Sequence, residues 1–148
     1  MSDVLVSAVP TDHVLSVWPR IEGYVREVVE TTTYGRYEVE DVLNQLLDGS
    51  HLLWIAFADD HIKGIVISGF QYYPRKKFLS CPFVAGEDFA SWKKPILEIL
   101  HRFARDNGCE GIEATGRIGW SRVFKDDGYK ALWQTFQLSD ESVGEGNG

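Results

Sequence analysis

The sequence predicts a single α/β domain in which helices cover both faces of a mixed β-sheet. Runs of apolar, β-branched and aromatic residues alternate along the chain with segments whose apolar residues recur every three or four positions. A strand–helix–strand unit over residues 77–115 brings two strands parallel. The 148 residues are 44% hydrophobic, which suits one domain whose core is large enough to fold unaided.

The N-terminal half predicts a strand, two helices and two further strands. Their expected ranges are Val4–Val9, Val14–Val29, Glu38–Leu47, Leu52–Ala58 and Ile62–Phe70. Pro19 lies inside the first helix, and a kink or break is expected there because proline lacks a backbone N–H and clashes with the preceding turn. Asp59-Asp60-His61 has the composition of a hairpin turn.

The C-terminal half continues the alternation and gives the order β-α-α-β-β-β-α-β-α-β. The expected elements are Lys77–Val84, Phe89–Asp106, Gly111–Thr115, Trp120–Lys125 and a last strand, Tyr129–Leu138. Residues 139–148 are rich in Gly, Ser and acid and predict a disordered tail. The folded domain is therefore expected to span residues 1–138.

Charge and cysteine content limit the expected partners, the cellular compartment and the kinds of site. With 22 acidic against 15 basic residues, the net charge of −7 repels phosphate backbones and anionic membranes, so neither nucleic acid nor membrane is an expected partner. Cys81 and Cys109 form no metal-type pair, which favours a reducing cytoplasm. No signal peptide and no run of about 20 apolar residues is found. The four histidines lack metal-ligand spacing, so no metal is expected.

The segment Gly119-Trp-Ser-Arg-Val-Phe-Lys-Asp-Asp-Gly-Tyr129 places a short helix before a Gly-aromatic step and a last strand. The element order resembles that of the GNAT superfamily of acyl-CoA-dependent N-acyltransferases over residues 4–138, and this segment resembles the family's closing motif. Residues 104–113 and 116–120 are also similar to small GNAT-like proteins of tailed phages. That second likeness implies a location in the host cytoplasm or a virion, with a virion or host protein as partner.

The resemblance implies a binding site for acetyl-CoA or another acyl-CoA. Family members hold the pantetheine arm along the fourth strand and the pyrophosphate in a glycine-rich loop before the long helix. The matching cofactor-binding residues here are Phe83, Val84, Ala85, Gly86 and Lys93.

This loop departs from the family pattern because Gly86 is its single glycine and two carboxylates, Glu87 and Asp88, follow it. Carboxylates at the start of a helix ordinarily complement its dipole, so the loop predicts a capped helix that needs no ligand. The alternative is a retained phosphate cradle, in which Lys93 and Lys94 partly offset the repulsion between these carboxylates and the pyrophosphate.

Catalytic candidates come from the strand at 111–115 and from the closing motif. Glu113 alternates with Ile112 and Ala114, so its carboxylate is expected to face away from them, where it serves as the candidate base; a solvated strand carboxylate is the alternative. Ser121 could donate to a ligand or cap its own helix. Phe124 stands where many relatives have a proton-donating tyrosine, and a phenyl ring has no proton to give.

Candidate substrate contacts lie in two places. Arg117 and Trp120 flank a Gly-rich turn, where a guanidinium and an indole could grip an anion or stack on a ring. Tyr34 and Tyr37 follow the first helix, where the resemblance implies the acceptor pocket. Two functions remain open: an N-acyltransferase acting on a small-molecule or protein amine, and a non-catalytic GNAT-like binding or virion-associated protein.

Overall fold

The computed structural model describes residues 3–116 and 120–138. The chain forms two compact units, residues 1–117 and 118–148, which are described here one after the other. The expected disordered tail, residues 139–148, lies outside the described residues.

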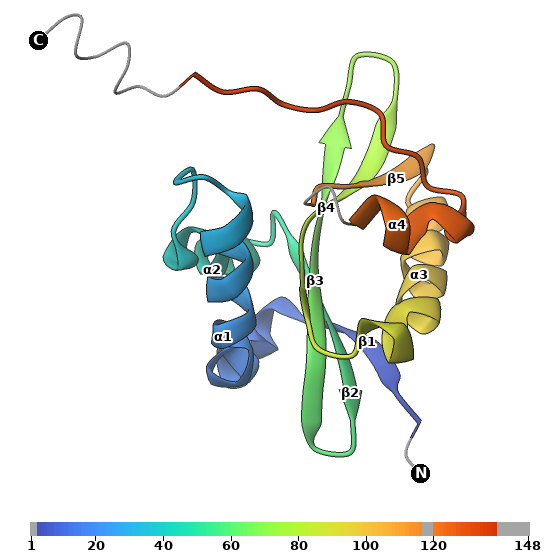
Figure 1. The fold of residues 1–148 in the computed structure, drawn as a ribbon. Coiled ribbons are helices and arrows are strands. Elements are labelled where there is room, and N and C mark those ends of the chain that lie inside the picture. Colours follow the sequence, from blue (N-terminus) through green and yellow to red (C-terminus); the bar gives the residue numbers. More distant parts are fainter. Residues whose placement is uncertain (1–2, 117–119, 139–148) are drawn as a thin grey trace, which may run out of the picture. The chain divides into compact units, whose positions relative to one another are not determined.

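The first unit is built on a five-stranded mixed sheet in the order β1-β2-β3-β4-β5 (Figure 1). Its strands are Leu5–Val9, Leu52–Ala58, His61–Tyr72, Lys77–Gly86 and Gly111–Ala114. The first four strands pair antiparallel, whereas β4 and β5 pair in parallel. The predicted side-by-side, parallel arrangement of the fourth and fifth strands is therefore confirmed.

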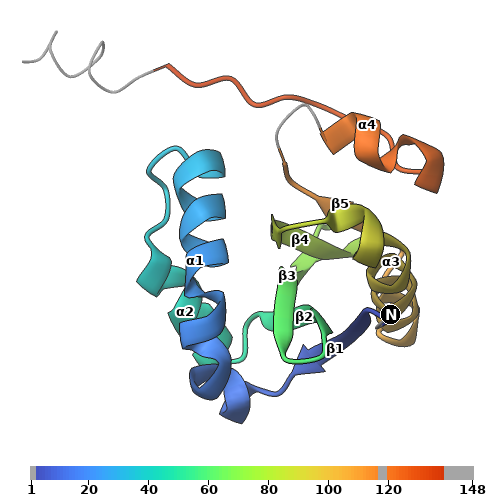
Figure 2. The same ribbon diagram turned by 60° about the horizontal axis from the view of Figure 1, so that its bottom comes forward.

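Helices cover both faces of this sheet, as the sequence predicts. The helices α1 (Val14–Thr32) and α2 (Val39–Leu47) lie on one face, and α3 (Phe89–Asp106) lies on the other (Figure 2). A short 3-10 turn, η1 (Thr11–His13), leads from β1 into α1. The α3 bounds coincide with the sequence prediction.

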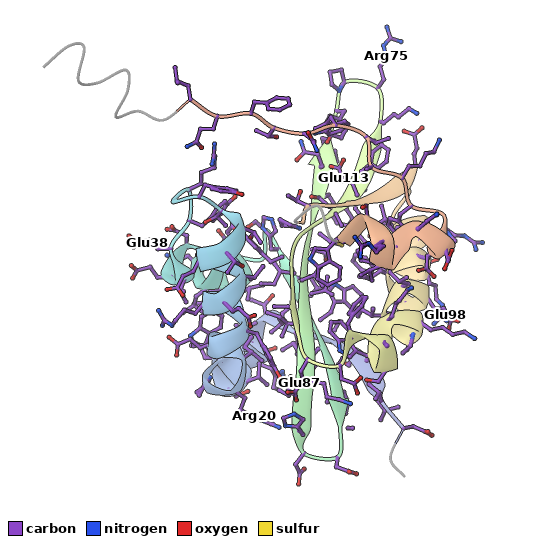
Figure 3. The ribbon with its side chains drawn as sticks, viewed as in Figure 1. Arg20, Glu38, Arg75, Glu87, Glu98 and Glu113 are labelled. Carbon is purple, nitrogen blue, oxygen red and sulfur yellow. The ribbon has the colours of Figure 1, made fainter. Side chains whose placement is uncertain are left out.

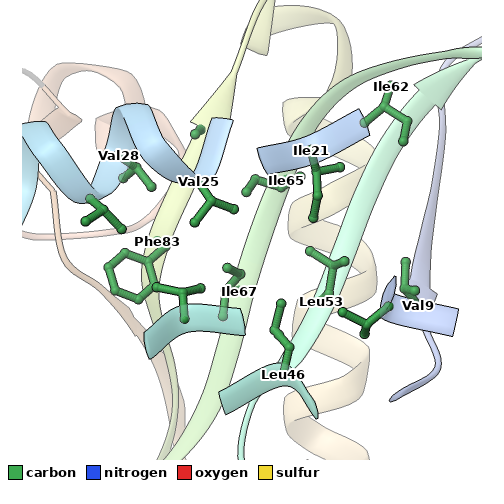
Figure 4. Packing of buried hydrophobic residues seen from close by; sticks show 14 residues of the cluster. Val9, Ile21, Val25, Val28, Leu46, Leu53, Ile62, Ile65, Ile67 and Phe83 are labelled. Carbon is green, nitrogen blue, oxygen red and sulfur yellow. The ribbon is translucent and has the colours of Figure 1, made fainter. Parts of the chain in front are cut away.

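Each face of the sheet carries its own core. On the α1/α2 face, buried side chains of both helices meet those of β2, β3 and β4, including Ile21, Val25, Leu46, Ile65 and Phe83 (Figure 4). On the α3 face, the buried side chains include Trp92, Ile96, Leu100, Trp54 and Val66. The long helices α1 and α3 bury the apolar residues that recur every three or four positions, because such residues share one helical face.

Of the kink or break expected at Pro19, the break is wrong, because α1 is continuous from Val14 to Thr32 with Pro19 inside it, and the kink stays a prediction. Proline removes one backbone hydrogen bond. The buried residues Val14, Ile21 and Val25 lie on both sides of Pro19, and we attribute the continuity of the helix to their packing.

The expected last strand, Tyr129–Leu138, is also wrong. The second unit contains α4 (Trp120–Phe124) and a 3-10 turn, η2 (Lys125–Asp127), and residues 129–138 form no strand. Strand pairing needs a ladder of backbone partners, and this unit offers none among residues 120–138. Apolar side chains of the segment are 69–87% exposed: Leu132, Trp133, Phe136 and Leu138.

A β-bulge in β4 shapes the site described below. Ile67 of β3 pairs with Phe83 and Gly69 pairs with Ser80, so Ser68 alone faces two residues of β4, Cys81 and Pro82. The extra residue reverses the alternation of β4. Leu79 and Cys81 therefore pack in the α3 core, whereas Phe83 and Ala85 pack in the α1/α2 core.

Trp54→Phe is expected to lower the free energy of unfolding by about 1 to 3 kcal/mol. The buried indole of Trp54 donates a hydrogen bond of 2.9 Å to Ser68 Oγ, and a phenyl ring leaves that hydroxyl without this donor. Urea unfolding of Trp54→Phe, Ser68→Ala and the double variant measures the effect. Strictly additive single effects would show that the bond contributes nothing.

Candidate functional site

The fourth and fifth strands pair over only part of β4. Their register runs from Phe78 opposite Gly111 to Cys81 opposite Ala114, and a last contact joins the Thr115 N–H to the Cys81 carbonyl at 3.4 Å. Beyond this point, β4 continues through residues 82–86 without a β5 partner. Within residues 3–116 and 120–138, one backbone edge of β4 thus has no strand partner along its C-terminal half.

Glu113 lies on β5 where this pairing ends. Ile112 packs in the α3 core, so alternation turns Glu113 towards the α1/α2 face, as predicted. The Tyr73 hydroxyl donates to both carboxylate oxygens of Glu113, at 2.7 and 3.0 Å. This bond to the carboxylate raises the pKa of Tyr73. Tyr73, in the β3–β4 turn, therefore holds the candidate base in place; Glu113 is labelled in Figure 3.

A histidine that sequence reasoning did not select lies on the same face. A Cβ built on Gly69 would come within 2.7 Å of His51 Cδ2 and 2.8 Å of its Nε2, so the ring covers Gly69. Gly69 pairs with Ser80, which pairs with Glu113. His51, Gly69, Ser80 and Glu113 thus form one cross-strand row, which we call the acceptor row. A glycine inside an apolar strand signals such a close approach, and Gly69 was the available clue.

Cys81 adjoins the acceptor row but faces the α3 core. Burial, and secondarily the charge of Glu113, raises the pKa of the Cys81 thiol to about 12. The thiol is therefore protonated near neutral pH and is a poor nucleophile.

The loop between β4 and α3 turns sharply at Gly86. Its φ is +147°, and a Cβ there would lie 2.4 Å from the Lys63 carbonyl oxygen and 3.0 Å from Trp92 Cζ2. The Glu87 N–H donates to the Lys63 carbonyl at 2.8 Å, and the Trp92 indole donates to the Glu87 carbonyl at 2.9 Å. The loop is held between β3 and the first turn of α3.

The two carboxylates of this loop turn towards two basic side chains of β3. Glu87 contacts the His61 ring, and Lys63 Nζ donates to Asp88 Oδ2 at 2.8 Å. This bond with Lys63 lowers the pKa of Asp88. Asp88 occupies the N-cap position of α3 but makes no side-chain capping bond to the helix backbone, so the expected side-chain cap is absent. Lys63 and His61 thus bind the carboxylates that sequence reasoning assigned to the start of α3.

A shallow groove of about 440 Å³ adjoins this loop. It is lined by α1 and the β2–β3 turn, including Arg20, Tyr24, Glu27 and His61. The Tyr24 hydroxyl donates to the Ile62 carbonyl at 3.0 Å. Partial burial, and then the charges of Glu87 and Glu27, raises the pKa of Tyr24.

The other predicted residues of the first unit lie in several places. Tyr37 packs edge-on against Phe83, with ring centroids 5.3 Å apart, so one acceptor candidate touches one cofactor candidate. Tyr34 is 77% exposed in the turn after α1. Val84 packs in the α3 core, opposite Phe83 and Ala85, and Lys93 lies in the first turns of α3.

The remaining predicted residues belong to the second unit or are not described. Trp120 stacks on Phe124 with centroids 5.5 Å apart, as expected for aromatic residues at helical spacing. Ser121 is exposed on α4, and Arg117 lies outside the described residues. A ligand shared by Arg117, Trp120 and Glu113 stays a prediction.

Two searches of the described ranges address other kinds of site. Within residues 3–116 and 120–138, no three His, Cys, Asp or Glu side chains gather as they would around a metal ion. In the same ranges, none of the helices has the length and apolar character that crossing a membrane requires.

Solved structures with the same fold include several acetyltransferases. A predicted acetyltransferase from Clostridium acetobutylicum with acetyl-CoA has a TM-score of 0.68, 13% identity, and coverage of 94% of this chain and 97% of that chain. A Trypanosoma brucei acetyltransferase has a TM-score of 0.66 and 12% identity, and the match covers 93% of this chain and 99% of that chain. An aminoglycoside acetyltransferase from an uncultured soil metagenomic sample, in complex with sisomicin, has a TM-score of 0.62 and 14% identity. That match covers 92% of this chain and 97% of that chain.

No protein-family model matches the sequence, and no curated protein matches it either. The likeness is therefore one of structure: the chain has the GNAT-like acyltransferase fold. Its particular features within that fold are the bulged β4, the acceptor row and the carboxylate-bearing loop.

Proposed function

We propose that this chain is an acyl-CoA-dependent N-acyltransferase that transfers an acetyl or other acyl group to an amine. The observation that carries the proposal is the edge of β4 over residues 82–86, which pairs with no strand in the part of the chain that the structure describes. The N–H and C=O groups of such an edge can pair with another extended amide chain as a strand would, and the pantetheine arm of coenzyme A is such a chain. When bound, the acyl-CoA supplies an activated thioester.

The candidate residues divide into binding and proton-handling groups. The β4 edge, with Gly86 and the start of α3, would hold the donor, and Lys93 would add a positive charge. Tyr34 and Tyr37 would line the acceptor side. Glu113, held by Tyr73, would take the proton of the incoming ammonium, directly or through water. Roles for Arg117, Trp120 and Ser121 remain proposals of the same kind.

The acceptor of this proposal is a cationic amine, either a small molecule or part of a protein. The net charge of −7 attracts such a group over long range. The similar structure solved with sisomicin is an aminoglycoside acetyltransferase, which makes aminoglycosides suitable first probes.

A second candidate function is a non-catalytic GNAT-like binding or virion-associated protein. Phe124 favours it, because its stacked ring can supply no proton to a leaving thiolate. Binding of coenzyme A separates the two candidates.

Coenzyme A is expected to bind the unmodified chain weakly, with Kd in the high micromolar range or above. Asp88→Gly should tighten binding, because it removes a carboxylate from the loop and frees Lys63 for the pyrophosphate. The φ of +51° at Asp88 suits glycine. One charge-assisted hydrogen bond contributes about 1.5 to 3 kcal/mol, which corresponds to a roughly 10- to 150-fold lower Kd. Titration calorimetry measures this difference in Kd.

Asp59→Gly is the matched control. Asp59 carries the same charge at a φ of +55° but lies in the β2–β3 turn, so its replacement should leave Kd within about twofold. Micromolar binding by the unmodified chain would contradict the account of the carboxylates. Absence of binding by all three proteins would leave the binding-protein function standing.

A further inference from the structure

The acceptor row contains one side chain whose chemistry the proposed function does not yet use, that of His51. Its ring lies over Gly69 on the α1/α2 face of the sheet. Adjacent strands are about 4.8 Å apart, so the ring lies about one strand from Ser80 and two from Glu113. Glycine and serine at the middle positions leave the floor of the row free of large side chains.

The position of His51 is held from several sides. Its backbone N–H donates to the Gln45 carbonyl at 3.1 Å at the end of α2, and Nδ1 lies 3.2 Å from Ser50 Oγ. Asp48 Oδ1 accepts the Ser50 N–H at 2.8 Å, which ties the turn together. These contacts place Nδ1 towards Ser50 and leave Nε2 over the sheet.

The charges around His51 come from three elements. Asp48, at the end of α2, favours the charged imidazolium, but the larger effect of burial lowers the pKa of His51. Glu113 of β5 stands at the far end of the acceptor row, with Tyr73 of the β3–β4 turn bonded to it. A lowered pKa keeps the imidazole neutral at neutral pH, which is the form that accepts a proton.

We propose that His51 is the proton carrier of the acyl transfer, taking a proton at Nε2 from the attacking amine over Ser80 and returning it to the leaving sulfur. The assignment rests on the proposed function. In the transfer the C–N bond forms and the C–S bond breaks. The proton lost by nitrogen passes to Nε2 and then to sulfur, so the imidazole ends neutral and no other reactant is needed.

The neighbouring groups are less suited to this task. The Cys81 thiol faces the α3 core with a pKa of about 12, and the Tyr73 hydroxyl is committed to Glu113. Glu113 is expected to remove the first proton, from the ammonium. A second group is required for the second proton, and His51 lies in the same row.

Nuclear magnetic resonance tests the placement without any turnover. The His51 resonance is assigned from the spectrum of His51→Gln, and its pKa is measured in the free chain and in the chain saturated with coenzyme A. We expect saturation to lower this pKa by at least about 0.3, because a thiol donating to Nε2 and loss of water both favour the neutral ring. His101, exposed on α3, should not change.

Activity tests the role. With acetyl-CoA and a panel of sisomicin, spermidine and a lysine peptide, His51→Gln is expected to lower kcat by roughly 10²- to 10⁴-fold while Kd for coenzyme A stays within about twofold. His101→Gln should leave both unchanged.

The outcomes separate the two proposals. A His51 pKa that coenzyme A leaves unchanged, or a His51→Gln variant with undiminished kcat, overturns the role of His51 alone. Failure of coenzyme A to bind at millimolar concentration excludes the proposed function, and the role of His51 with it. A lowered pKa supports the assignment whichever amine is the acceptor.

Discussion

Gly86→Ala is expected to lower the free energy of unfolding by at least about 3 kcal/mol, a severe effect for a single substitution. The φ of +147° is strained for any residue with a Cβ, and that atom would lie 2.4 Å from the Lys63 carbonyl oxygen and 2.5 Å from Gly64 Cα. Both obstacles are backbone, so no side-chain rotation relieves them. Urea unfolding followed by circular dichroism measures the change.

Gly23→Ala is the control for this substitution. Gly23 lies inside α1, and a Cβ there would meet nothing within 4 Å, so alanine should stabilise the chain by about 0.5 to 1 kcal/mol. A Gly86→Ala variant as stable as the unmodified chain would mean that the loop between β4 and α3 has another conformation.

Glu113→Gln is expected to lower kcat/KM for the acceptor amine by at least about 100-fold. The amide keeps the shape of the side chain and can still accept the Tyr73 hydroxyl, but it carries no charge and does not take a proton. Initial rates of thiol release from acetyl-CoA measure the effect.

Two variants frame that result. Glu98→Gln makes the same change on the exposed side of α3 (Figure 3) and should leave the rate within about twofold. Tyr73→Phe removes the bonds to Glu113 while keeping the carboxylate, so a loss smaller than that of Glu113→Gln is expected. An active Glu113→Gln variant would assign the first proton transfer to another group or to water.

The sequence predicted the elements of the first unit well, because their signals are local. The helix from Phe89 to Asp106 shows apolar residues at helical spacing and ends at Asn107-Gly108, so both bounds followed from the pattern. The strand Leu52–Ala58 likewise has the predicted bounds. The orientation of Glu113 followed from simple alternation along β5.

Features that depend on partners distant in sequence were missed. The bulge at Cys81–Pro82 is defined by pairing with β3, and β4 alone shows a regular apolar run. Asp88 was assigned to its own helix, although Lys63, 25 residues earlier, binds it. His51 has no periodic or motif signal, and only its contact with Gly69 reveals a place in the candidate site.

The bulge in β4 also makes this strand unequally tolerant of different kinds of sequence change. Substitutions of similar size at Phe83, Val84 or Ala85 keep each side chain on its own face of the sheet. Deleting a single residue at Cys81–Pro82 would remove the bulge and still leave Phe83 on the α1/α2 face, because strict alternation from Leu79 then places it there. Deleting Val84 instead would move Ala85 from the α1/α2 face to the α3 face. The tolerance of β4 to a change of length therefore depends on where along the strand the change falls.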